Sequence, residues 1–134
     1  MKWTIAVAAI ASSLLSVPAL AQEQAPEAWR QVAIAGGCTV AIPSESSFPS
    51  NVVVSWDHAC AAGQPISGDG VLRMTTADGR AVTMEGTWVS GVPNGTVVLT
   101  GYDTTGAARM QRSDQYNMGC QIADGVVCTP YQPG

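Results

Sequence analysis

The chain pairs an acid with an imidazole at one place, where Asp57 is followed by His58, its single histidine. A carboxylate beside an imidazole can orient a general base, but catalysis would also need a nucleophile, such as Ser55 or Ser67, brought to the imidazole by the fold. Neighbouring residues of a strand point to opposite faces, so we expect Asp57 and His58 not to act together. The sequence has no nucleophile elbow and no phosphate-binding loop, and we predict no catalytic residue.

The other reactive side chains are four cysteines, Cys38, Cys60, Cys120 and Cys128. The Cys-x₂-Cys spacing of most zinc sites is missing, and one histidine cannot complete the usual ligand sets. An even number of cysteines is typical of disulfides in an exported chain. Three pairings are open, and we favour Cys38–Cys60 with Cys120–Cys128 because each pair then lies within one local unit. We therefore predict two disulfides, no metal ion and no cofactor.

Carboxylates suggest two further sites, and the sequence argues against both. Asp-Gly pairs occur at 69–70, 78–79 and 124–125, but the Asp-x-Asp-x-Asp spacing of calcium loops is absent, so we expect tight turns there. Asp57 and Glu85 occupy equivalent places in a repeat described below and could share a sheet face. Two carboxylates alone predict a solvated surface.

The N-terminal residues predict export. Lys2 precedes an apolar run from Ile5 to Leu15, and Ala19-Leu20-Ala21 has the small-x-small pattern of a signal-peptide cleavage site. The apolar run is too short to span a bilayer as a helix. No cysteine for lipid attachment follows it. We predict a signal peptide over residues 1–21 and a periplasmic or secreted product without stable membrane insertion.

The rest of the chain is acidic, with five arginines against ten carboxylates and a formal charge of −5. Nucleic acid and anionic lipid both favour basic surfaces, so we predict no nucleic-acid partner and disfavour docking to an anionic membrane. We expect residues 22–30 to form a tether or a single helical turn, with Trp29 docked on the body. Residues 31–134 are expected to form one domain.

Short β-branched and apolar segments alternate with Gly, Pro and Asp through this domain, and helical periodicity is not sustained. Asp78-Gly79 predicts a hairpin with a type I′ turn, Val92-Pro93-Asn94-Gly95 predicts another turn, and Pro43–Ser50 predicts a loop. The expected fold is all-β, an antiparallel meander of hairpins. Its strands are predicted over residues 31–35, 52–56, 71–76, 81–84, 96–102 and 107–112.

A spacing of 28 residues recurs along the domain. A fixed spacing of glycines and large side chains is typical of a repeat array, in which each hairpin buries its face against its neighbours. The residues at this spacing are Gly63, Gly91 and Gly119, each three residues after Cys60, Trp88 or Tyr116, and the pairs Val82 with Met110 and Trp56 with Met84.

Residues 84–95 resemble a MORN repeat in Gly86, Trp88, Gly91 and Gly95, with Met84 at an aromatic position. The flanking units keep fewer of the signature residues, and the resemblance extends over about residues 54–126. The period is longer than is usual for MORN repeats, which implies longer hairpins. The flanking units keep Trp56, Gly63, Gly68 and Gly70 before this segment, and Tyr116, Gly119 and Gly125 after it.

The resemblance implies a repeat sheet with an interaction or scaffolding role. We therefore expect an exported, non-enzymatic domain that binds a protein through sheet edges and a concave face. The alternative is a small inhibitor of a hydrolase, for which the stiff Pro43–Ser50 loop would be suited. The candidate binding or repeat-core residues are Trp56, Trp88, Tyr116, Gly63, Gly91 and Gly119, and for the aromatic residues a core position is favoured.

Overall fold

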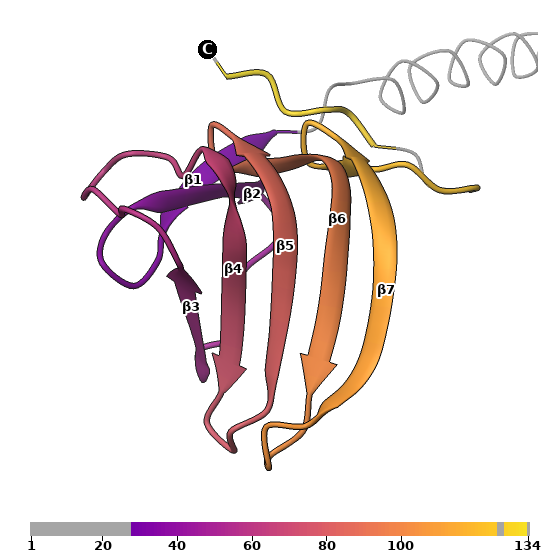
Figure 1. Cartoon of the computed structure of the whole chain (residues 1–134). Helices are drawn as coiled ribbons and strands as arrows, with labels where there is room; N and C mark the ends of the chain where they lie inside the picture. Colours follow the sequence, from indigo (N-terminus) through magenta and orange to yellow (C-terminus); the bar gives the residue numbers. More distant parts are fainter. Residues whose placement is uncertain (1–27, 126–127, 134) are drawn as a thin grey trace, which may run out of the picture.

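The computed structural model describes residues 28–125 and 128–133. The predicted signal peptide and residues 22–27 of the predicted tether lie outside these ranges. The described residues form strands and no helix, which confirms the all-β prediction (Figure 1). The strands are β1 (Trp29–Ala33), β2 (Thr39–Pro43), β3 (Val52–Trp56), β4 (Gly68–Thr76), β5 (Ala81–Val89), β6 (Val92–Tyr102), β7 (Ala108–Asn117) and β8 (Cys120–Gln121).

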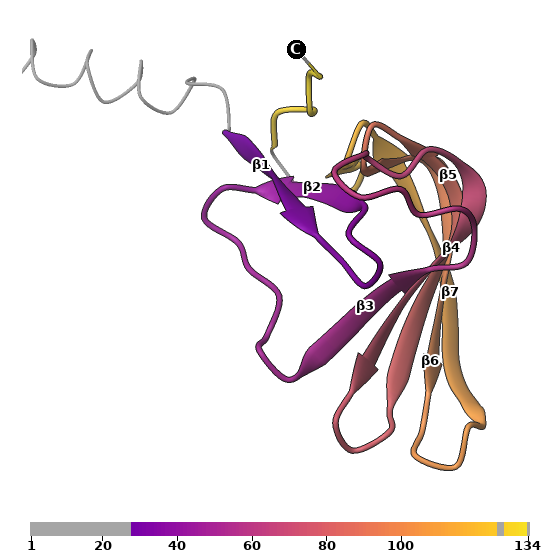
Figure 2. The ribbon, with the colours of Figure 1, turned by 90° about the vertical axis from the view of Figure 1, so that its left-hand side faces the viewer.

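The strands form two antiparallel sheets. From β3 to β8 each strand pairs with the next along the chain, which confirms the predicted meander, and β1 pairs with β2 in a separate hairpin. The hairpin lies across the end of the meander sheet that holds the β5–β6 turn (Figure 2). The N–H of Ala41 in β2 donates to the carbonyl of Gly91 in that turn at 2.9 Å. We call the sheet face turned toward this hairpin the inner face.

The hairpin differs from the sequence-based expectation in two ways. β1 begins at Trp29, so the last two residues of the predicted tether belong to a strand. Trp29 is docked as predicted: its Nε1 donates to the carbonyl of Thr129 at 3.3 Å, and its ring centroid is 5.6 Å from that of Tyr131. β2 was not predicted, although Thr39–Pro43 carries the β-branched residues that favour strands.

Two predicted turns are corrected. In the β4–β5 loop only Gly79 has a positive φ, 93°, and the carboxylate of Asp78 binds Thr76 and Arg80 at the base of the loop. The type I′ prediction for Asp78-Gly79 is therefore wrong. Residues 92–95 belong to β6, and the chain instead reverses at Ser90-Gly91, where both φ angles are positive, 50° and 91°.

The core lies between the β1–β2 hairpin and the inner face of β3–β5. Alternation along each strand sends one set of side chains inward, where burial removes apolar surface from water. The buried cluster comprises Ile34, Cys38, Val40, Val54, Trp56, Ile66, Leu72 and Trp88. Both predicted disulfides are present, with Cα–Cα distances of 5.0 Å for Cys38–Cys60 and 5.9 Å for Cys120–Cys128.

The 28-residue spacing corresponds to the register of the meander. Residues 28 apart lie in the same row, two strands from each other. One row comprises Trp56, Leu72, Met84, Leu99 and Arg112, and the next comprises Val54, Met74, Val82, Gly101 and Met110. Gly63, Gly91 and Gly119 all have positive φ, and each N–H donates to a carbonyl of the preceding unit at 2.8–2.9 Å.

Candidate functional site

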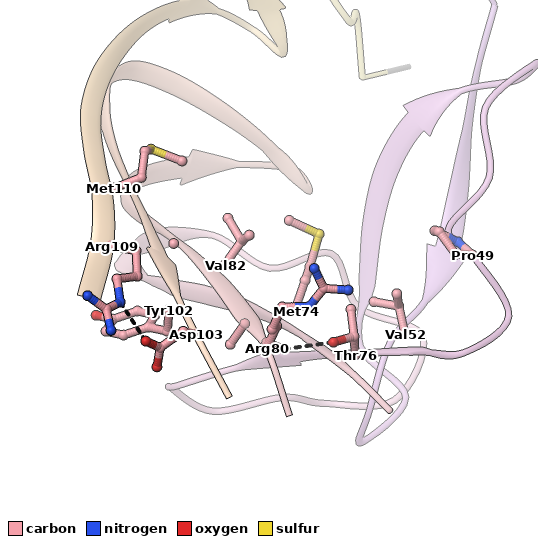
Figure 3. A pocket seen from close by; sticks show the side chains of 12 residues that line it. Pro49, Val52, Met74, Thr76, Arg80, Val82, Tyr102, Asp103, Arg109 and Met110 are labelled. Carbon is pink, nitrogen blue, oxygen red and sulfur yellow. Dashed lines mark hydrogen bonds and ion pairs between the residues drawn. The ribbon is translucent and has the colours of Figure 1, made fainter. Parts of the chain in front are cut away.

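The inner face carries an open groove of about 630 Å³ at the end of the sheet that the hairpin does not cover. Figure 3 shows its side chains, which come from β3–β7 and from the loop before β3. Most of the lining is apolar, and the charged side chains are those of Arg80 in the β4–β5 loop, Asp103 in the β6–β7 loop and Arg109 near the start of β7. The lining residues are Pro49, Val52, Met74, Thr76, Arg80, Ala81, Val82, Gly101, Tyr102, Asp103, Arg109 and Met110.

The floor of the groove is the row that runs from Met74 through Val82 and Gly101 to Met110. These residues face inward by strand alternation, and no residue of β1 or β2 lines the groove beside them, although Met74 also packs against the core. Gly101 adds no side chain to the row, and a Cβ there would make an ordinary contact with Cε of Met110 at 3.5 Å. Met110 is 44% exposed, high for an apolar side chain facing the inside of a sheet. The groove therefore presents unfilled apolar surface.

The charged residues at the groove are held by hairpin-loop contacts. Oδ2 of Asp103 accepts a hydrogen bond from Nε of Arg109 at 2.5 Å, and Oδ1 accepts from the N–H of Thr105 at 2.9 Å. The hydrogen bond from the Thr105 hydroxyl, followed by that from Arg109, lowers the pKa of Asp103 to about 2. Arg80 donates through Nε to Asp78 at 2.9 Å. Asp103 is therefore ionised at neutral pH, with both oxygens already hydrogen-bonded.

A smaller cavity of about 210 Å³ continues from Met74 into the space beneath the hairpin. Its walls include Leu72, Met84, Trp88 and Tyr116. Trp88 is 3% exposed, and its Nε1 has no hydrogen-bond partner among the described residues. Apolar surface is thus continuous from the open groove into the interior, and one buried donor borders the deeper part.

The outer side of β7 is a free sheet edge in the described part of the chain (Figure 1). β8 pairs only with Tyr116 and Asn117, and the N–H of Ile122 donates to the carbonyl of Gln115 at 2.7 Å. Backbone groups of alternate residues face the same neighbouring strand. Gln111 and Ser113 therefore direct their N–H and C=O groups away from β6, as Gln115 does. None of the described residues pairs with this side of β7 from residue 108 to 114.

The predicted separation of Asp57 and His58 is wrong: Oδ1 of Asp57 lies 2.6 Å from Nδ1 of His58. β3 ends at Trp56, so strand alternation no longer applies to these two residues. The N–H of Val71 donates to the same oxygen at 2.8 Å and, together with His58, lowers the pKa of Asp57. Ser67 accepts a hydrogen bond from the N–H of Ser90 at 3.1 Å. Among the described residues, no hydroxyl hydrogen-bonds to His58.

The carboxylates Asp57 and Glu85 line one open hollow on the sheet, together with Asp69. The Asp69-Gly70 pair lies inside β4, so the expectation of a turn there is wrong. Gly70 is required by packing, since a Cβ would lie 2.5 Å from Cη2 of Trp56. In the described ranges, no three His, Cys, Asp or Glu residues could hold a metal ion, and no helix is long and apolar enough to cross a membrane.

The structure places the two candidate tryptophans in the core and the three candidate glycines in turns. Trp56 and Trp88 are buried and meet edge to face with centroids 6.0 Å apart, and Tyr116 borders the inner cavity. Sequence reasoning missed the groove. Val82 and Met110 were found as repeat positions, which was the one available signal, but their exposure depends on how far the unpredicted β2 reaches.

No family model, curated protein or solved structure matches the chain. The resemblance to MORN repeats therefore stays a prediction.

Proposed function

We propose that this chain is an exported, non-enzymatic binding domain that holds a partner protein by adding one of the partner's strands to β7. The observation that supports this proposal is the free edge from Ala108 to Asp114, whose outward backbone groups have no partner among the described residues. An added strand would satisfy these groups by regular antiparallel or parallel pairing, a common way of binding extended peptides.

Side chains along β7 would give such a strand its specificity. Met110, Arg112 and Asp114 lie on the inner face, and a neighbouring strand places alternate side chains beside them. Nε of Arg112 is 3.3 Å from Oδ2 of Asp114, an oxygen that makes no hydrogen bond within the described residues. These charges also disfavour indiscriminate pairing of edges between copies of the chain. The net charge of the exported form argues for a protein partner over nucleic acid.

A proline on β7 tests this proposal. Ser113→Pro removes an outward-facing N–H while leaving the hydrogen bonds between β6 and β7, so the fold should survive. A photo-crosslinking side chain at Gln111 should capture one dominant protein from the envelope and secreted fraction of the source organism. Ser113→Pro should reduce that capture at least about tenfold, the effect of losing one or two net hydrogen bonds.

Two matched variants complete the experiment. Ser113→Ala keeps the N–H and should leave capture unchanged, and a crosslinker at Thr105, in the β6–β7 loop, should capture little. Undiminished capture by a folded Ser113→Pro protein would contradict strand addition.

Hydrolase inhibition is a second candidate, favoured by the anchoring of the loop after β2. Phe48 packs against the core, and Nη2 of Arg30 donates to the carbonyl of Ser46 at 2.6 Å, while the serines between residues 44 and 47 remain exposed. A loop held in this way loses little entropy on docking. Inhibition of an enzyme in a hydrolase panel, abolished by replacing residues 44–47 with glycine, would support this role.

A further inference from the structure

The groove on the inner face supports a separate proposal, which does not depend on strand addition at β7. We propose that it binds an anionic amphiphile with a single alkyl chain, such as a fatty acid, with the alkyl chain on the groove floor and the carboxylate at Arg80 of the β4–β5 loop and Arg109 of β7.

The shape and lining of the groove suit an alkyl chain. Its volume of about 630 Å³ lies within the range of sites for small molecules. The floor from Met74 to Met110 is apolar, and methionine side chains adapt to flexible ligands. Gly101, which has no side chain, lets an alkyl chain approach the backbone of β6 beside Met110. Met74 also borders the inner cavity of about 210 Å³, so apolar surface continues beyond the groove for a longer chain.

The charges at the groove suit an anionic head group. Two arginines, Arg80 and Arg109, line the groove together with the carboxylate of Asp103, and a second carboxylate, Asp78, pairs with Arg80 beside the lining. Each arginine contacts its aspartate through Nε, and the two side chains are 65% and 71% exposed. The terminal guanidinium nitrogens form no hydrogen bond with the described residues. Each of them can therefore donate charge-assisted hydrogen bonds to a carboxylate.

Calorimetric titration with dodecanoate, below its micelle concentration, tests the proposal on the oxidised protein. We expect one binding site, at least about tenfold weaker binding of dodecylamine, and a similar loss of dodecanoate affinity in Arg80→Gln/Arg109→Gln. Arg73→Gln, which removes an arginine outside the groove, should bind dodecanoate as the parent does. Equal affinity for the amine and the carboxylate would overturn the assignment of the head group.

A variant with a larger side chain in the groove tests where the alkyl chain binds. Gly101→Leu should fill the groove without backbone strain, since Gly101 does not have a positive φ and its Cβ would make an ordinary contact with Met110. Dodecanoate binding should be lost, whereas Val98→Leu, on the other face of the same strand, should retain it. Full dodecanoate binding by a folded Gly101→Leu protein would overturn the location.

Two further experiments separate binding of a monomeric fatty acid from binding to a membrane surface and from strand addition at β7. Vesicles of phosphatidylcholine with phosphatidylglycerol offer the same chemistry at a membrane surface, and binding to vesicles without binding to monomeric dodecanoate would overturn the fatty-acid assignment. Ser113→Pro should bind dodecanoate normally, so the groove and the β7 edge can succeed or fail independently.

Discussion

The carboxylate of Asp103 accepts hydrogen bonds from across the β6–β7 loop: from the N–H and hydroxyl of Thr105, from the N–H of Ala107, and from Nε of Arg109. These donors favour its ionised form and hold its pKa near 2, below the ordinary 3.8. A folded pKa below the unfolded value stabilises the fold above pH 4, and that contribution is lost as the pH falls from about 4 to 2.

Asp103→Asn should therefore lower the urea midpoint at pH 7 and make the midpoint less sensitive to pH between about 4 and 2. Urea unfolding followed by tryptophan fluorescence at several pH values measures both effects. Glu45→Gln, which changes an exposed carboxylate in the loop after β2, serves as the control and should change neither. If the urea midpoint of Asp103→Asn fell between pH 4 and 2 as much as that of the parent, the stabilising role of the Asp103 carboxylate would be contradicted.

For two glycines on the inner face we predict opposite effects of an alanine substitution on stability. At Gly70 a Cβ would lie 2.5 Å from Cη2 of the buried Trp56, so Gly70→Ala should destabilise the protein by about 1–3 kcal/mol through overpacking. At Gly101 the nearest atom would be 3.5 Å away, and Gly101→Ala should be neutral or stabilise by up to about 1 kcal/mol. Urea unfolding of the two variants measures both changes in stability. Equal destabilisation by the two substitutions would show that the space beside Gly101 is already filled.

Among the elements, the β1–β2 hairpin is joined to the β3–β4 connection by the Cys38–Cys60 disulfide and by backbone hydrogen bonds, such as the one that the N–H of Ile66 donates to the carbonyl of Thr39. The bridge spans 22 residues and Cys38 is 1% exposed, whereas Cys120–Cys128 spans eight residues near the chain's end. Cys38→Ala/Cys60→Ala should lower the free energy of unfolding by about 3–4 kcal/mol. Cys120→Ala/Cys128→Ala should lower it by roughly 1 kcal/mol less, because opening a shorter loop adds less conformational entropy to the unfolded chain. Urea unfolding of both double variants measures the difference, and the reverse order would contradict it.

The elements were predictable where local chemistry decides them. The run Val52–Trp56 was predicted with its observed bounds, and the cysteine pairs followed from their nearness along the chain. The turns were less predictable, because Asp78 can bind its neighbours through its side chain as well as adopt a positive φ. Residues 92–95 have turn composition, yet pairing with β5 and β7 holds them in a strand. Such long-range pairing overrides local preference.

For the whole molecule, the candidate site could not be predicted, because it depends on where one sheet stops covering another. The spacing of Val82 and Met110 placed them in one repeat position, and sheet register places them in one row. Whether that row is buried depends on the length and placement of the β1–β2 hairpin, which contacts the far end of the sheet through Ala41 and Gly91. Packing between distant segments is not encoded in local periodicity.

Partial coverage of one face predicts two zones of stability within the same strands. Amides near Trp88 lie beneath the hairpin, whereas amides near Val82 border the groove, where few apolar contacts oppose local opening. Hydrogen exchange followed by mass spectrometry should show faster exchange in peptides covering residues 76–83 and 99–110 than in those covering 84–90. Dodecanoate should slow exchange in the peptides covering residues 76–83 and 99–110 and leave the peptides covering 84–90 unchanged, and Gly101→Leu should abolish this slowing.

A bound alkyl chain must stabilise the part of the sheet that it contacts. Exchange that is uniform along β5 and unaffected by dodecanoate would therefore mean that the groove is neither a region of lower stability nor a binding site.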